Sequence, residues 1–137
     1  HGFRSHDQRK LPDEAQRINV NLIRLARHLA PDIGVVDGTV GLQGDGPGGT
    51  DAVELGVAAA SVDVFAVDAV MAKVMGFEPL ELGLLRYGHE HSIGVADLEA
   101  IEVVGSTIDE VQRTFKPHDA VELQLQWHDS QAAALIG

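Results

Sequence analysis

The chain has 137 residues and no cysteine, and its 10 basic and 21 acidic side chains give a formal net charge of −11. This balance argues against a nucleic-acid partner, because phosphate binding depends on clustered Lys and Arg. The lack of thiols excludes disulfides and an iron–sulfur cluster held by the chain's own cysteines. No apolar run approaches the length of about 18 residues that a membrane-spanning helix needs.

The start of the chain differs from the rest in charge. We expect a single domain, residues 1–137, because of the length of the chain. The chain has no initiator Met and no apolar signal segment, so we expect it to be a fragment of a longer protein. Residues 1–17 are expected to form a basic N-terminal arm, either solvated or docked on the acidic body or on upstream structure. Residues 18–115 are expected to form an α/β body, and residues 116–137 a C-terminal strand and tail.

In the first half of the chain, apolar residues recur at helical spacing over residues 18–29, before a proline. Residues 33–36 are apolar and β-branched, which predicts a buried strand. A glycine-rich loop is expected at residues 41–50, because its density of Gly and Pro is incompatible with a helix or strand interior. A second buried strand is predicted over residues 54–60.

In the second half, Asp63 is expected to cap a helix that ends before Gly76. Further elements are predicted as helices at 80–89 and 108–115, and as strands at 101–104 and 121–128. Strands that alternate with helices indicate an α/β layered domain. We expect a mostly parallel mixed sheet flanked by helices, with 121–128 as a possible antiparallel edge strand because its polar and apolar residues alternate.

The segment after the first predicted strand offers candidate ligands. Asp37 and Gly38 end the strand, and Gly44, Asp45 and Gly46 follow in the loop. Ligands of open α/β domains lie at this edge of the sheet, so Gly38, Gly44, Asp45 and Gly46 are predicted to bind a ligand. The loop contains no Lys or Arg and matches no phosphate-binding motif, which favours a divalent cation such as Mg²⁺ or Ca²⁺ held by Asp37 and Asp45. The alternative is a structural turn whose aspartates bind their own backbone.

Asp68 lies within an otherwise apolar helix, so we expect it in or beside the core. A buried carboxylate needs a partner, and it is either a structural tie or a catalytic base with a perturbed pKa. His89 and His91 also suggest a metal site. However, imidazoles two residues apart on a helix point away from each other, and a role at the helix C-terminus explains them better.

Several motifs occur in a recognisable order, namely residues 35–38 (VVDG), 44–47 (GDGP), 63–70 and 75–77. In this respect the chain resembles the domain of unknown function 362 family, over about residues 18–113. The resemblance implies the C-terminal part of that domain, in a longer, prokaryotic protein, and we expect a cytoplasmic location. It also implies two kinds of partner: the upstream part of the same protein, or an iron–sulfur, ferredoxin-like module. The family assigns no catalytic role to these motif residues.

Three functions remain open from the sequence. The first is an accessory module of an iron–sulfur or redox-associated protein that binds a cation or small ligand through residues 37–51. The second is a metal-assisted enzyme acting on an anionic small molecule, with Asp68 as base. The third is a structural or oligomerisation domain in which strand 121–128 pairs with another copy or with upstream sheet. Whether the chain is an enzyme therefore stays open.

Overall fold

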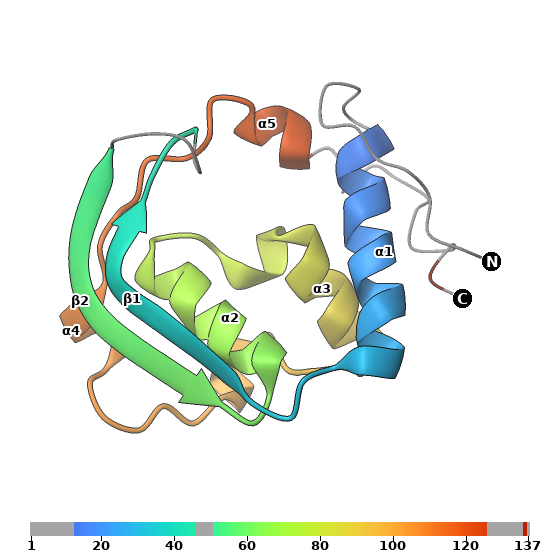
Figure 1. Cartoon of the computed structure of the whole chain (residues 1–137), viewed down its shortest axis with the longest axis horizontal. Coiled ribbons are helices and arrows are strands. Elements are labelled where there is room, and N and C mark those ends of the chain that lie inside the picture. The colour runs from blue at the N-terminus through green and yellow to red at the C-terminus, as the bar shows by residue number, and fades with distance from the viewer. Residues whose placement is uncertain (1–12, 46–50, 126–135, 137) are drawn as a thin grey trace.

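The structure is a computed structural model that describes residues 13–45, 51–125 and 136. Its elements in chain order are α1 Asp13–Leu29, β1 Gly34–Leu42, β2 Ala52–Ser61, α2 Val64–Val74, the 3-10 turn η2 Pro79–Glu81, α3 Gly83–Glu90, the 3-10 turn η3 Leu98–Ala100, α4 Ile108–Val111 and α5 Val121–Gln124. The β1–β2 hairpin covers one side of α2, while α3 and then α1 lie on the other side (Figure 1). The mixture of helices and strands confirms an α/β composition.

The sheet is antiparallel, so the prediction of a mostly parallel sheet is wrong. β1 pairs with β2 in a register that sets Gly34 opposite Ser61 and Gly38 opposite Val57. Only residues 43–51 connect the two strands. A parallel pair needs a crossover of a dozen or more residues, so this short connection forces the chain to turn back as a hairpin.

A β-bulge interrupts the register halfway along the hairpin. The pairing moves from Gly38–Val57 to Val40–Glu54, so two residues of β2 oppose Thr39 alone. Gly56, one of those two, has a φ of +70°, a conformation that glycine adopts without steric cost. The bulge therefore divides β2 into two parts, and the part after the bulge continues to Ser61.

Helix α2 is apolar around most of its circumference because it packs against two layers. Val67, Met71 and Val74 pack beneath the hairpin. Phe65 and Ala69 belong to the main core, which α2 shares with α1 and α3. As predicted, Asp63 caps this helix, accepting hydrogen bonds from the backbone N–H groups of residues 65 and 66, and Gly76 follows its C-terminus with a φ of +87°. The most apolar helix of the sequence thus becomes the centre of the fold.

Two predicted strands are wrong in the described part of the chain. Residues 101–104 adopt no regular secondary structure and pair with no strand, and 121–124 form the single helical turn α5. In both segments the side-chain pattern suits a strand, but a strand also needs a neighbour to accept its backbone hydrogen bonds. Residues 126–128 of the second predicted strand lie outside the described part.

The remaining boundaries differ modestly from those predicted. Helix α1 begins at Asp13, so the expected arm of residues 1–17 ends earlier, and residues 1–12 lie outside the described part. The helix predicted at 80–89 is divided into η2 and α3, and the one predicted at 108–115 is only α4. Among the described residues, no helix has both the length and the apolar character needed to cross a membrane.

Candidate functional site

Asp37 lies within β1 rather than at its end. Its side chain is exposed, and its Oδ1 accepts hydrogen bonds from the Thr39 hydroxyl at 2.6 Å and from the Thr39 backbone N–H at 2.9 Å. These two bonds hold the pKa of Asp37 below its ordinary value, the hydroxyl being the larger cause. The carboxylate therefore has a local structural partner within the strand.

Gly38 faces the interior, where no room for a ligand is left. A Cβ atom built on Gly38 would lie 2.8 Å from the Val57 side chain and 3.2 Å from the Met71 methyl group. Three residues further along β1, a Cβ on Gly41 would lie 2.6 Å from the ring of Phe115. These glycines let the hairpin approach α2 and Phe115 closely, which explains them by packing.

The segment around Gly44 and Asp45 is tied to a distant part of the chain. The Gly44 N–H donates to the carbonyl of Lys116 at 2.9 Å, and the Asp119 N–H donates to Asp45 Oδ1 at 2.9 Å. His118 Nε2 lies 3.4 Å from the same oxygen. The structure thus brings a lysine and a histidine to a loop that contains neither, and the loop anchors residues 116–119. Gly46 lies outside the described residues.

The two predicted metal ligands bind different partners. Asp37 lies within β1 and accepts from Thr39, whereas Asp45 lies after the strand and accepts from the Asp119 N–H. Within the described ranges, no group of three or more His, Cys, Asp or Glu residues is arranged to hold a metal ion. Cation binding by Asp37 and Asp45 stays a prediction, and the hydrogen bonds of both carboxylates favour the structural alternative.

Asp68 lies on the exposed side of α2, which corrects the expectation of a place in the core. Desolvation by its apolar surroundings nevertheless raises the pKa of its carboxyl above the ordinary value of 3.8. Exposure and desolvation coexist because the neighbouring side chains of an apolar helix displace water from one side of the group. A catalytic role for Asp68 stays a prediction.

The other polar candidates act locally. The second carboxylate oxygen of Asp63 accepts a hydrogen bond from the Val95 N–H at 2.8 Å, so one side chain both caps α2 and fixes the loop after α3. His89 Nδ1 lies 3.4 Å from the Ala96 N–H, whereas His91 Nδ1 lies 3.3 Å from an Arg27 guanidinium nitrogen. The two imidazoles contact different segments, in agreement with the sequence argument against a shared metal.

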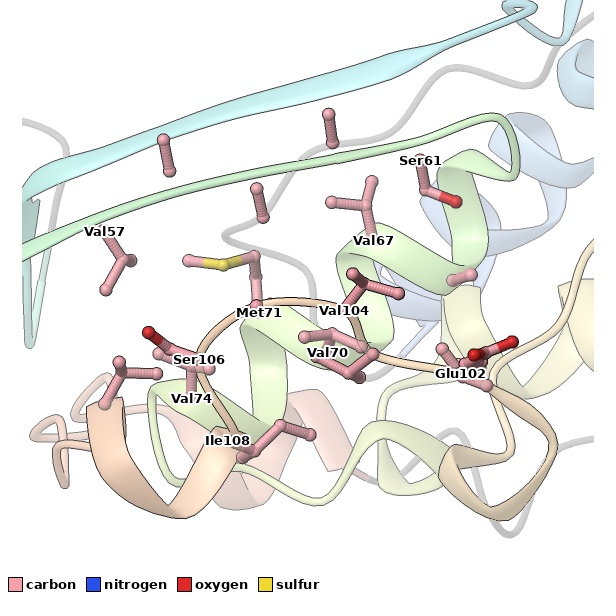
Figure 2. A pocket seen from close by; sticks show the side chains of 18 of the residues that line it. Val57, Ser61, Val67, Val70, Met71, Val74, Glu102, Val104, Ser106 and Ile108 are labelled. Atoms are coloured by element: carbon pink, nitrogen blue, oxygen red, sulfur yellow. The ribbon is translucent and has the colours of Figure 1, made fainter.

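The structure contains a groove of about 460 Å³ that the sequence did not indicate. Its walls are Gly56–Ser61 of β2 and the segment Ile101–Ser106, which belongs to no helix or strand, and its floor is formed by α2 (Figure 2). The floor residues include Val67, Val70 and Met71, and Ile108 and Val111 of α4 close one end. This volume lies within the range typical of ligand sites.

Most of the side chains that line the groove are apolar. Glu102 is the charged residue among those that line it, and Ser61 and Ser106 add two hydroxyl groups (Figure 2). An apolar floor with few polar groups is suited to binding rather than to acid–base catalysis. The sequence had indicated β2, α2 and residues 101–104 as separate elements, but nothing in it could show that they enclose a space.

A family model for a domain of unknown function (DUF362) matches residues 2–73, more than half of the chain. The chain belongs to the DUF362 family. The match includes α1, the hairpin and most of α2, and it ends before the segment 101–106. The match lies at the beginning of this chain. It does not confirm that the resemblance extends to residue 113, and it does not confirm the assignment to the C-terminal part of the domain.

A relative of this DUF362 chain is a thylakoid-associated protein of Synechocystis, 38% identical over 66 residues. The matched stretch is 48% of this chain but 21% of the relative, so the chain spans about a fifth of that protein's length. No solved structure matches the chain. Family and relative agree in describing an uncharacterised domain, and the relative's association with thylakoids is a property of that protein.

Proposed function

We propose that this DUF362 chain is a ligand-binding accessory module and that its binding site is the groove between β2, α2 and residues 101–106. The observation that supports this most directly is the groove itself, with its continuous apolar floor of Val67, Val70, Met71 and Val74. Burial of apolar ligand surface would contribute about 25 cal/mol per Å². An enzyme is favoured less, because the described residues that line the groove include no His, Cys or Lys.

A dye-binding experiment tests this proposal. Val104 is 88% exposed at the mouth of the groove, so Val104→Asp adds a charge there without disturbing the core. Val62 is 84% exposed and does not line the groove, which makes Val62→Asp a matched control. We expect the neutral apolar dye Nile red to bind the wild type, and Val104→Asp to weaken binding at least about fivefold, since a charge beside apolar ligand surface is unfavourable. Equal binding by the two variants would contradict the proposal.

The proposal also includes a cation site at Asp37 and Asp45 and a redox partner. Asp45→Asn separates the two roles of that residue, because the amide oxygen still accepts the Asp119 N–H bond while the negative charge is lost. If Mg²⁺ or Ca²⁺ binds, a metal concentration of a hundred times Kd should stabilise the wild type by about 2.7 kcal/mol. The melting temperature of the wild type should therefore rise, and the melting temperature of the variant should stay unchanged. Equal shifts in both proteins would exclude Asp45 as a ligand.

The cytoplasmic location and the iron–sulfur or ferredoxin-like partner also stay proposals. The chain holds no cysteine, so a cluster would have to be ligated by another polypeptide or by residues other than thiols. The upstream part of a longer DUF362 protein is one such polypeptide, and a homo-oligomer is another possible assembly. Fractionation of cells that express the tagged full-length protein would show whether it is cytoplasmic or bound to a membrane.

A further inference from the structure

The side chains that line the groove limit the chemistry of its ligand. Valine, alanine, isoleucine and methionine supply the apolar surface, and the described lining residues include no Phe, Tyr or Trp. They include no Lys, Arg or His either, so the groove offers no cationic side chain to a phosphate, sulfate or carboxylate. Met71 contributes a flexible thioether that adapts to irregular apolar shapes. Such a lining suits a saturated hydrocarbon surface without an anionic group.

The groove is elongated along its floor. The residues of α2 that line it extend from Ala66 to Val74, a rise of roughly 12 Å along the helix. On the wall above, the lining stretch Gly56–Ser61 of β2 spans roughly 17 Å. Figure 2 shows α2 and β2 side by side over this stretch, with the side chains of both directed into the space between them. The shape therefore accommodates an extended chain.

The two ends of the groove differ in polarity. Ile108 and Val111 of α4 close one end with aliphatic side chains. Ser61 and Glu102 lie toward the opposite end (Figure 2). Ser106 lies toward the α4 end but is exposed, so its hydroxyl group remains in contact with water. An occupant with an apolar tail and a polar head would therefore lie with its tail toward α4.

The polar end distinguishes between kinds of head group. Ser61 Oγ accepts a hydrogen bond from the Asp63 backbone N–H at 3.0 Å, which leaves the hydroxyl hydrogen of Ser61 to donate. The carboxylate of Glu102 offers acceptors only. A hydroxyl head group can accept from Ser61 and donate to Glu102. An ammonium has no lone pair for Ser61, and a sulfate or carboxylate is repelled by Glu102.

We propose that the groove binds an uncharged amphiphile with a single straight alkyl chain and a hydroxyl head group. This inference rests on the proposed function, because it names the ligand class of the same groove. The alkyl chain lies on the apolar floor of α2 with its tip toward Ile108, and the hydroxyl group lies at the end that carries Ser61 and Glu102. Each further methylene group adds affinity because it buries more apolar surface.

The test measures displacement of Nile red from the whole chain by the straight-chain primary alcohols hexanol, octanol and decanol. We expect the affinity to rise at least about fivefold for each pair of added methylene groups. Octyl sulfate and octylammonium share the chain of octanol but carry a charged head, and we expect each to bind at least about fivefold more weakly than octanol. Equal affinities of the three alcohols would overturn the alkyl site. A charged amphiphile that binds as tightly as octanol would overturn the hydroxyl head.

Protein variants locate the bound chain and its head. Ala59 lines the groove and packs toward α2, so Ala59→Leu fills the path of the alkyl chain and should weaken decanol at least about fivefold. Ala52→Leu is the matched control, because Ala52 is an exposed residue of the same strand outside the groove. Glu102→Gln removes the charge and keeps an acceptor oxygen, so it should strengthen octyl sulfate and change octanol less than about twofold. Equal decanol binding by the two leucine variants would overturn the inference.

The outcomes separate this inference from the proposed function. Nile red binding that Val104→Asp weakens, but that no alcohol displaces, would overturn the ligand class and leave the groove as a binding site. Failure of the wild type to bind either Nile red or the alcohols would remove both proposals. The alcohol series uses the wild-type chain, so its result does not depend on the folding of a variant.

Discussion

At the scale of single residues, the aspartates of this chain serve the backbone. Asp37 accepts from Thr39, Asp45 from the N–H of Asp119, and Asp63 from residues 65, 66 and 95. Each of these contacts satisfies N–H groups at a turn, bulge or helix end, where regular secondary structure leaves donors without partners. Asp68 differs, because its apolar surroundings desolvate its carboxyl and raise its pKa.

Replacing Asp68 by Asn tests this difference. The folded-state pKa of Asp68 is raised above its ordinary value of 3.8, so ionisation weakens the folded state. The stability linked to the protonated form is fully present below pH 3.8 and is lost as pH rises through the folded pKa. We expect Asp68→Asn to raise the free energy of unfolding at pH 7 and to make little difference below pH 3.8, as measured by urea denaturation. If the unfolding free energies of Asp68→Asn and the wild type differ equally at both pH values, the effect comes from helix propensity instead.

At the scale of elements, close approach between α2 and its neighbours depends on glycine. Gly38 gives the hairpin access to Met71, and Gly88 gives α3 access to the ring of Phe65. Gly88 lies inside a helix, where the sequence alone would suggest that Ala is more favourable. The contact with Phe65 reverses this expectation, since interiors are close-packed and leave no space for another methyl group.

The variant Gly88→Ala measures that contact. Its Cβ would lie 2.1 Å from the Phe65 ring, so either the ring or the helix must move. We expect a loss of about 1–3 kcal/mol in the free energy of unfolding by chemical denaturation, as in other overpacked cores. In a double-mutant cycle, the added methyl group should cost less when Phe65→Leu provides space. Additive effects of the two changes would show that the helices are not in contact as described.

At the scale of the whole molecule, the core joins the two ends of the chain. Ile136 is 2% exposed and lies in the main core with Val20 and Ile23 of α1. The Arg27 guanidinium donates to the Ile136 carbonyl at 2.8 Å. The hairpin packs on α2 through one face and bonds to residues 116 and 119 through the loop after β1, while Val35 and Val40 on it are exposed. Contacts of α2 with its neighbours on both sides therefore hold the fold together.

Replacing Ile136 by Ala tests whether the last residues stabilise the core. We expect a loss of about 2–5 kcal/mol, because a large buried side chain is removed. That is a large part of the stability of an ordinary domain. Leu29→Ala is the control, since Leu29 is 70% exposed and its truncation should change stability by no more than about 0.5 kcal/mol. Similar melting temperatures for Ile136→Ala and the wild type would contradict the described position of the C-terminus.

The sequence by itself determined the local features of this protein. The apolar periodicity of α1, the Asp63 cap, the stop at Gly76 and the presence of a strand at 54–60 follow from residue spacing, because the interactions that decide them lie within a few residues. The expected burial of that strand is wrong, since its residues are alternately exposed and half-buried in a two-stranded sheet. The family resemblance was also readable from the ordered motifs. Only the tertiary structure decided the antiparallel pairing, the ties of Asp45 to residues 118 and 119, and the unpaired state of residues 101–104. These features depend on which distant segments meet, and the groove exists because β2, α2 and residues 101–106 come together around one space.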